Sequence, residues 1–177
     1  EVAKSKGWKV GIISSVSLDH ATPAAFYAHQ PSRSKMYEIS MEFAKSNFDY
    51  FAGGQFLKPK GADGQPDALE TAKANGFTFV SGKAGLESLK PGVGKVVATS
   101  PMVDKDAAMY YEVDRPADQP SLADFVRKGI ELLDNPTGFF MVVEGGKIDW
   151  ACHANDAAAA IHDTLAFDAA VAEAVKF

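Results

Sequence analysis

The sequence predicts an α/β fold built on a mostly parallel sheet, and three observations support this fold class. Short apolar runs of strand length alternate with helical segments along most of the 177 residues. The run from Gly138 to Val143 is apolar without interruption, as expected for a central strand covered by helices on both faces. A content of 46% hydrophobic and 11% aromatic residues is that of a folded chain with a real core.

The remaining strands and the helices are predicted in chain order from such runs and from cap residues. Four further strands are predicted at residues 10–13, 50–54, 77–80 and 95–99. Helices are predicted at residues 3–7, 24–29, 34–47, 67–75, 83–89 and 122–133, and from His153 to the last residue. The first helix has only a C-terminal glycine cap and the last has no stop signal, so we expect the chain to begin and to end inside helices.

Three details complete the predicted organisation. Thr22 is the expected N-cap of the second helix, with Pro23 at its first helical position. Residues 55–66 are rich in Gly, Pro and Lys and are predicted to be irregular and exposed. Residues 100–120 are predicted to form a loop or a surface excursion from the sheet, so we expect one domain over residues 1–177.

Charge and cysteine content exclude several classes of function. Lys and Arg total 18 against 23 for Asp and Glu, a net charge of −5, so no general basic field attracts a nucleic-acid polymer. The single cysteine, Cys152, excludes an intramolecular disulfide framework and a zinc cluster built on cysteines. No run approaches the roughly 20 apolar residues of a membrane span.

Two carboxylates and an imidazole follow the apolar run that ends at Val143. Glu144 comes directly after it, and Asp149 and His153 are four residues apart, so on a helix both would lie on one face and could share a cation such as zinc. Open α/β sheets bind ligands at this end of their strands. The alternative is structural, with Asp149 capping a helix, His153 an ordinary polar residue and Glu144 an exposed loop acid.

Other polar residues near the first predicted strand also have two interpretations. Arg33 could hold a phosphate group through two parallel hydrogen bonds, or be a solvated surface arginine. Thr22 needs no metal to explain it, because a Thr-Pro pair commonly begins a helix. His20 could touch a bound anion or ion through water, or be polar surface, and Trp150 is expected to form a partly buried wall.

Three segments are more specific together than any one of them. They are Asp-His-Ala-Thr-Pro-Ala-Ala-Phe-Tyr-Ala-His at 19–29, Arg33, and Val-Glu-Gly-Gly-Lys-Ile-Asp-Trp-Ala-Cys-His-Ala-Asn at 143–155. Taken together they resemble the alkaline phosphatase family, and the resemblance extends over nearly the whole chain. It implies a three-layer α/β/α sandwich with a mostly parallel sheet, of which these residues make up an incomplete part.

The resemblance also implies roles for individual residues. Thr22 and Glu144 match magnesium ligands, and Asp149 and His153 match ligands of one of two catalytic zinc ions. Arg33 matches the arginine that holds the substrate phosphate. His20 and Trp150 match variable positions that tune the surroundings of magnesium and phosphate.

The implied reaction is hydrolysis of phosphate monoesters through a phosphoserine intermediate. The family's nucleophilic serine lies in an Asp-Ser-Ala segment that is not among these residues, nor are the later Asp-His pair and further histidine that complete the zinc sites. We therefore expect the isolated chain to be inactive and to bind metal weakly. The family is commonly exported, which implies a periplasmic or other extracytoplasmic location, and unpaired sheet edges imply a possible homo-oligomer.

Two alternatives to this function stay open from the sequence. The first is a non-catalytic α/β interaction module that acts through a surface contact and would leave the candidate residues scattered. The second is a phosphodiesterase, sulfatase or cofactor-independent mutase of the same superfamily. The Ala-Thr-Pro segment and the nearby Arg33 favour a monoesterase over these relatives.

Overall fold

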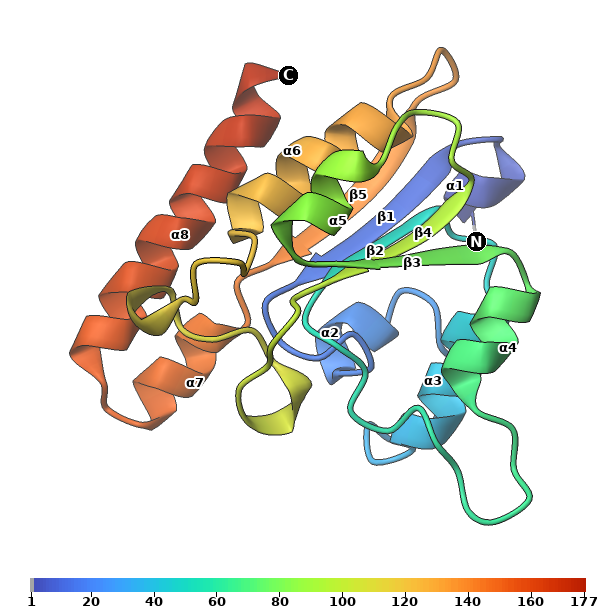
Figure 1. The fold of residues 1–177 in the computed structure, drawn as a ribbon, viewed down its shortest axis with the longest axis horizontal. Coiled ribbons are helices and arrows are strands. Elements are labelled where there is room, and N and C mark those ends of the chain that lie inside the picture. Colours follow the sequence, from blue (N-terminus) through green and yellow to red (C-terminus); the bar gives the residue numbers. More distant parts are fainter. Residues whose placement is uncertain (1) are drawn as a thin grey trace.

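A computed structural model describes residues 2–177 and contains one five-stranded sheet within them (Figure 1). The strand order is β3-β4-β2-β1-β5, and every neighbouring pair is parallel. The strands are β1 (Lys9–Ser14), β2 (Tyr50–Gly53), β3 (Phe77–Ser81), β4 (Lys95–Thr99) and β5 (Phe139–Glu144). The prediction of a parallel α/β sheet is confirmed.

Helices cover both faces of the sheet and make three layers (Figure 1). The helices are α1 (Val2–Ser5), α2 (Ala21–Ala24), α3 (Met36–Lys45), α4 (Ala68–Ala74), α5 (Gly82–Ser88), α6 (Leu122–Leu133), α7 (Lys147–His153) and α8 (Ala157–Lys176), with 3₁₀ turns η1 (Lys105–Ala107) and η2 (Glu112–Asp114). One core cluster lies under α3 and α4, and the other lies under α5, α6 and α8. Side chains alternate along β1 accordingly, with Val10 and Ile12 in the first cluster and Ile13 in the second.

β5 lies at an edge of the sheet, so the prediction of a central strand is wrong for this chain. Among the described residues it pairs only with β1, and Phe140 on it is 42% exposed. An apolar run indicates only that both faces of a strand suit apolar neighbours. Such a run does not indicate whether the strand lies in the middle of the sheet or at a free edge of the sheet.

Two helix predictions also need correction. α2 begins at Ala21 with His20 in the N-cap position, so Thr22 lies inside the first turn and the helix does not extend to His29. The predicted long C-terminal helix is interrupted after His153, where Asn155 has a left-handed φ of 55° and the Asp156 side chain caps α8. The apolar period continues across this break, which explains why periodicity did not reveal it.

Residues 100–120 form an irregular segment with two 3₁₀ turns that packs against the sheet end. Gln119 is fully buried, and its amide oxygen accepts hydrogen bonds from the Ser100 hydroxyl and the Tyr110 backbone N–H. The Met109 N–H donates to the Ser15 carbonyl at 2.9 Å. The segment is therefore attached to the loop that follows β1.

Candidate functional site

The site begins where two neighbouring strands end side by side. Ser14 and Glu144 are the last residues of β1 and β5 and are paired in register. The Ser14 hydroxyl donates to a Glu144 carboxylate oxygen at 2.6 Å. Because all strands of the sheet are parallel, their carboxyl ends lie on the same side of the sheet, and α/β proteins bind ligands at these strand ends.

The loop after β1 is held in place by a buried carboxylate. Asp19 is fully buried and accepts hydrogen bonds from the backbone N–H groups of Leu57 and Lys58 and from the Ser40 hydroxyl. These contacts tie the loop to the segment after β2 and to α3. The next residue, His20, consequently has a defined position at the start of α2.

His20 connects two of the segments that the sequence singled out. Its Nε2 atom lies 2.8 Å from Nη2 of Arg33, which arrives from the loop between α2 and α3. Its ring meets Trp150 of α7 edge-on, with centroids 5.8 Å apart. Arg33 and α7 therefore converge on the same histidine, although 117 positions separate Arg33 from Trp150 in the sequence.

The surroundings of His20 favour its neutral form. Burial lowers the pKa of His20, the Arg33 charge lowers it further, and the carboxylates of Glu144, Asp19 and Asp149 oppose these effects. Since an arginine can only donate, His20 Nε2 accepts and Nδ1 carries the proton. Nδ1 is buried without a hydrogen-bond partner in the described part of the chain. A buried donor of this kind suits a polar group brought by a bound ligand or water.

Asp149 and His153 lie on one face of α7 as their spacing requires. Asp149 Oδ1 and His153 Nε2 are 3.5 Å apart, and their side chains are 71% and 80% exposed. Zinc–ligand bonds of about 2.1 Å at a tetrahedral angle put two ligand atoms about 3.4 Å apart. The pair therefore fits two ligands of one zinc ion, with the other positions left to further ligands.

Among the described residues, neither Thr22 nor Glu144 forms a hydrogen bond or ion pair with another predicted site residue. Thr22 is exposed on α2, and Glu144 accepts its hydrogen bond from Ser14. The described part of the chain contains no group of three or more His, Cys, Asp or Glu side chains that could hold a metal ion. Within residues 2–177, the pair of Asp149 and His153 is therefore the set of predicted ligands that lies close together.

Sequence reasoning missed two residues at the site. Ser14 could have been found, because it is the polar residue that directly follows the apolar run of β1. Lys147 is fully buried and pairs with Asp104 at 2.6 Å. Its only sequence signal is its place inside the Glu144 to His153 segment, since a lysine is ordinarily exposed.

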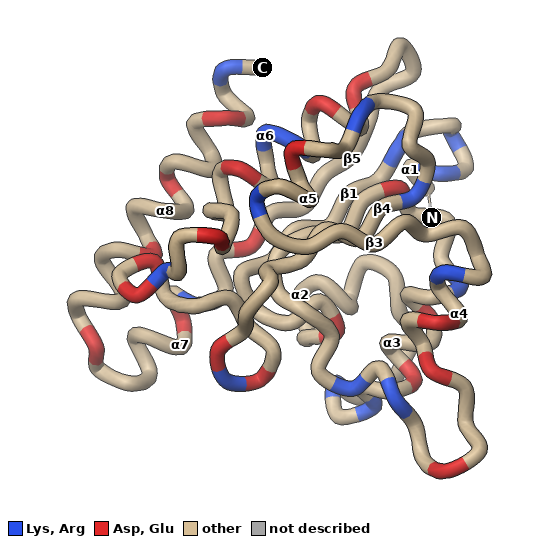
Figure 2. The backbone as a smooth tube through the Cα atoms, viewed as in Figure 1, with Lys and Arg blue, Asp and Glu red and all other residues tan. Residues whose placement is uncertain are grey.

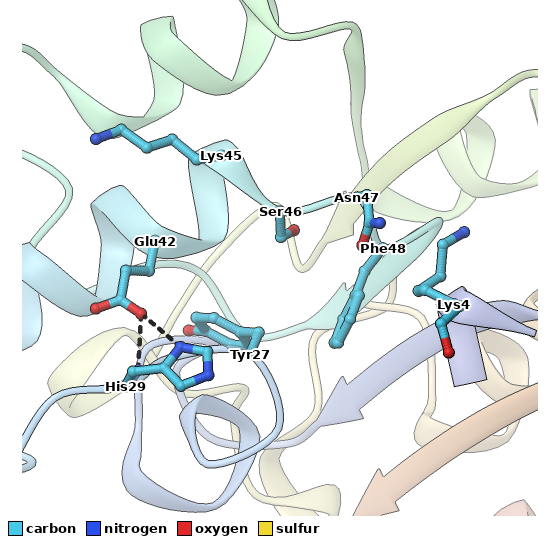
Figure 3. Close-up of a pocket in the computed structure, with 9 residues that line it drawn as sticks. Lys4, Tyr27, His29, Glu42, Lys45, Ser46, Asn47 and Phe48 are labelled. Atoms are coloured by element: carbon cyan, nitrogen blue, oxygen red, sulfur yellow. Dashed lines mark hydrogen bonds and ion pairs between the residues drawn. The ribbon is translucent and has the colours of Figure 1, made fainter. Parts of the chain in front are cut away.

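A cavity of the described residues lies away from the candidate site (Figure 3). It has a volume of about 580 Å³ and lies before the amino ends of β1 and β2, whereas Glu144 lies at the carboxyl end of β5. Glu42 accepts a hydrogen bond from the His29 backbone N–H there, and Lys4 pairs with Asp49 at 2.8 Å. These charged groups are satisfied within the protein, so the cavity is not part of the candidate site.

Charge is mixed over the molecule, and acidic and basic residues are interspersed along the backbone in Figure 2. Among residues 2–177, no helix combines the length and the apolar character that crossing a membrane requires.

Comparison with known proteins points to one family. The family model for alkaline phosphatase matches residues 1–177. Alkaline phosphatase 4 of Bacillus subtilis is 32% identical and aligns with 100% of this chain and 38% of its own length. The Escherichia coli alkaline phosphatase is 31% identical, with 100% and 47% covered. The chain thus spans less than half the length of these curated relatives.

Solved structures give the same result for the fold. The alkaline phosphatase of the Antarctic bacterium TAB5 has a TM-score of 0.86 at 31% identity and covers 100% of this chain and 51% of its own. A cold-active alkaline phosphatase of a Shewanella species has a TM-score of 0.85 at 29% identity, with 99% and 41% covered. One structure of a TAB5 mutant carries Mg.

Proposed function

Because this chain belongs to the alkaline phosphatase family, we propose that it provides the phosphate-binding arginine and part of the metal site of an enzyme that hydrolyses phosphate monoesters. The proposed intermediate is a phosphoserine whose serine is not among these residues. The observation that carries the proposal is the contact of His20 with both Arg33 and Trp150.

Arg33 has the chemistry to bind the phosphoryl oxygens. A guanidinium has five N–H donors in a planar fork that matches phosphate, and its positive charge is permanent. His20 accepts from one Nη2 hydrogen, and the exposed side chain leaves the remaining donors available for an anion. Neutral His20 orients the guanidinium without adding a charge, and its Nδ1–H is a further donor for a phosphate oxygen or a water.

Four residues are proposed as metal ligands. Asp149 and His153 would contribute an oxygen and a nitrogen to one zinc ion, and Glu144 and Thr22 would contribute oxygens to magnesium. The Ser14 hydroxyl holds the Glu144 carboxylate in one orientation. Bound metal ions would supply Lewis-acid stabilisation of the charge that develops on the oxygens during phosphoryl transfer.

The two alternatives are less well supported. A non-catalytic module predicts scattered candidate residues, whereas Arg33 and Trp150 share a partner and the carboxylates of Glu144 and Asp149 act on the same histidine. A phosphodiesterase, sulfatase or mutase relative is disfavoured because the alkaline phosphatase model matches the full chain.

Calorimetry with inorganic phosphate tests the role of Arg33. We expect Arg33→Ala to weaken phosphate binding by at least about tenfold, as expected for loss of charge-assisted hydrogen bonds. Arg33→Lys should retain part of the affinity, because lysine keeps the charge but not the fork. Arg127→Ala, which removes an exposed arginine of α6, is the control and should bind like the wild type. Equal affinities for Arg33→Ala and the wild type would refute the assignment.

The metal assignment and the expected inactivity are tested separately. The dissociation constant for zinc should be higher than micromolar, because two protein ligands leave most of the coordination to water. His153→Ala should abolish this weak binding. The isolated chain should release no p-nitrophenol from p-nitrophenyl phosphate at alkaline pH with zinc and magnesium. Metal-dependent turnover above a heat-denatured control would contradict the expected inactivity.

We propose a periplasmic or other extracytoplasmic location on the basis of the family alone. We also propose that the chain self-associates, because β5 leaves an open sheet edge among the described residues. A single monomeric species at all concentrations in ultracentrifugation would contradict the second proposal.

A further inference from the structure

Lys147 is a fully buried lysine at the first position of α7. Lysine is among the residues least often buried, and a buried ammonium is retained only where charge and hydrogen-bond partners compensate for the lost water. Neither the predicted ligand set nor the phosphate contact uses Lys147. Its burial therefore calls for a separate explanation.

The partners of Lys147 come from two segments. Its Nζ atom donates to an Asp104 carboxylate oxygen at 2.6 Å and lies 3.6 Å from the ring centroid of Tyr111. The same ammonium lies 5.3 Å from the ring centroid of Trp150, one turn further along α7. Both ring contacts are within the range of cation–π attraction. Lys147 therefore links the 100–120 segment to the aromatic side chain that meets His20.

Electrostatics agree with an ionised pair at this position. Burial alone would raise the pKa of Asp104, but the hydrogen bond from Lys147 and the backbone N–H of Lys105 lower it below its ordinary value. Asp104 is 34% exposed on its side chain, so one end of the pair still reaches water. The pair is thus a charged anchor at the edge of the site rather than a neutral core contact.

A continuous chain of contacts runs from this anchor to the phosphate-binding residue. Trp150 has the Lys147 ammonium near its ring and packs against the His20 ring in a T-shaped arrangement, and His20 in turn accepts a hydrogen bond from Arg33. A tryptophan released from Lys147 could leave the His20 ring, and His20 would then lose one of the contacts that determine its orientation. The direction of the Arg33 guanidinium depends on that orientation.

We infer that Lys147 is a positioning residue: by joining Asp104 and Tyr111 to Trp150, it holds Trp150 against His20 and thereby sets the orientation of Arg33. The inference rests on the proposed phosphate-binding role of Arg33. A purely structural lysine would affect the stability of the fold, but it would leave Trp150 and phosphate affinity unchanged in molecules that remain folded.

The test uses Trp150 as its own reporter. All variants carry Trp8→Phe, so that Trp150 is the single tryptophan of the chain. Lys147→Met keeps the length of the side chain and removes its charge. Lys95→Met is the matched control, because Lys95 lies 4.4 Å from the Phe77 ring centroid at the amino end of the sheet, away from the site. Acrylamide quenching reports Trp150, calorimetry reports binding of inorganic phosphate, and circular dichroism reports folding.

We expect Lys147→Met to make Trp150 more accessible to acrylamide and to lower phosphate affinity about tenfold, the lower end of the effect of residues that hold a site's ligands in place. Lys147→Arg should restore much of both properties, and Lys95→Met should change neither. Unchanged quenching of Trp150 in folded Lys147→Met would overturn the inference, whatever the phosphate affinity.

Asp104→Asn covers the case in which Lys147→Met does not fold. It weakens the anchor without removing the lysine, and it should shift both readouts in the same direction by a smaller amount, while no shift in quenching would overturn the inference. Failure of the wild type to bind phosphate would instead reject the proposed role of Arg33. The coupling of Lys147 to Trp150 would then be decided by the quenching series alone.

Discussion

Gly53→Ala is the substitution that most directly tests how the end of β2 supports the site. Gly53 has φ of +121°, a conformation that is essentially restricted to glycine, and a Cβ added to it would lie 1.9 Å from the carbonyl oxygen of Ser14. To reach even the 3.0 Å lower limit of real Cβ contacts, that carbonyl would have to retreat by more than an ångström. Ser14 also donates to Glu144, so the displacement would reach the proposed metal ligand.

The expected loss of stability has two parts that a control separates. Backbone strain alone costs about 1–3 kcal/mol, and the clash with a buried backbone atom adds enough to place the total at about 4 kcal/mol or more. Gly64→Ala isolates the strain, because Gly64 has φ of +82° and an added Cβ would meet nothing within 4 Å. Urea denaturation followed by circular dichroism measures both variants. Equal losses for Gly53→Ala and Gly64→Ala would refute the claim that close approach to Ser14 requires glycine.

Three further predictions concern the helices and the sheet edge. Ser121→Ala should lower the free energy of unfolding by about 1 kcal/mol, because it removes one half of the capping box with Asp124 at the start of α6; an unchanged urea midpoint would contradict this. Burial raises the pKa of Asp163 above its ordinary value, so the folded state takes up this proton before the unfolded state does as the pH falls. As the pH falls from 7 to about 4, the free energy of unfolding of the wild type should therefore rise relative to that of Asp163→Asn. A difference between the two proteins that does not change with pH would refute this prediction. Phe140→Glu should reduce self-association in ultracentrifugation, because Phe140 is 42% exposed on the edge strand β5 and a charge there opposes edge pairing; undiminished association would rule out this edge as the contact.

Regular elements with strong local signals could be predicted from the sequence. The predicted helix at residues 122–133 coincides with α6, because Ser121 and Asp124 form a capping box and the apolar positions follow one helical face. The break after His153 could not be predicted in the same way. Asn155 tolerates a left-handed conformation, and the alanines that follow at 157–160 favour helix, so the local sequence shows no stop.

The local sequence predicted the arrangement of the candidate site less well than it predicted the helices, and the reason is physical. The spacing of Asp149 and His153 determines their separation once α7 forms, so the sequence could anticipate that pair. The direction of Arg33 depends on an irregular loop and on His20, and neither has a periodic signal. Lys147 was missed because only the arrival of Asp104 and Tyr111 from a distant segment makes its burial possible. The roles of Thr22, Glu144, Asp149, His153 and Arg33 stay predictions.

The position of Glu144 beside Ser14 depends on the register of β5, and shape rather than polarity specifies that register. β5 is apolar on both faces, with Val142 in one core cluster and Met141 in the other, so a one-residue slip would still bury apolar side chains.

Met141 is paired with Gly11, and the Cβ that Gly129 of α6 lacks would lie 3.1 Å from the Met141 sulfur. These two glycines leave the room that the long methionine occupies, and a slip would bring Phe140 or Val142 to this place. Since Glu144 follows Met141 by three residues, the close packing at Met141 determines where the carboxylate lies at the strand end.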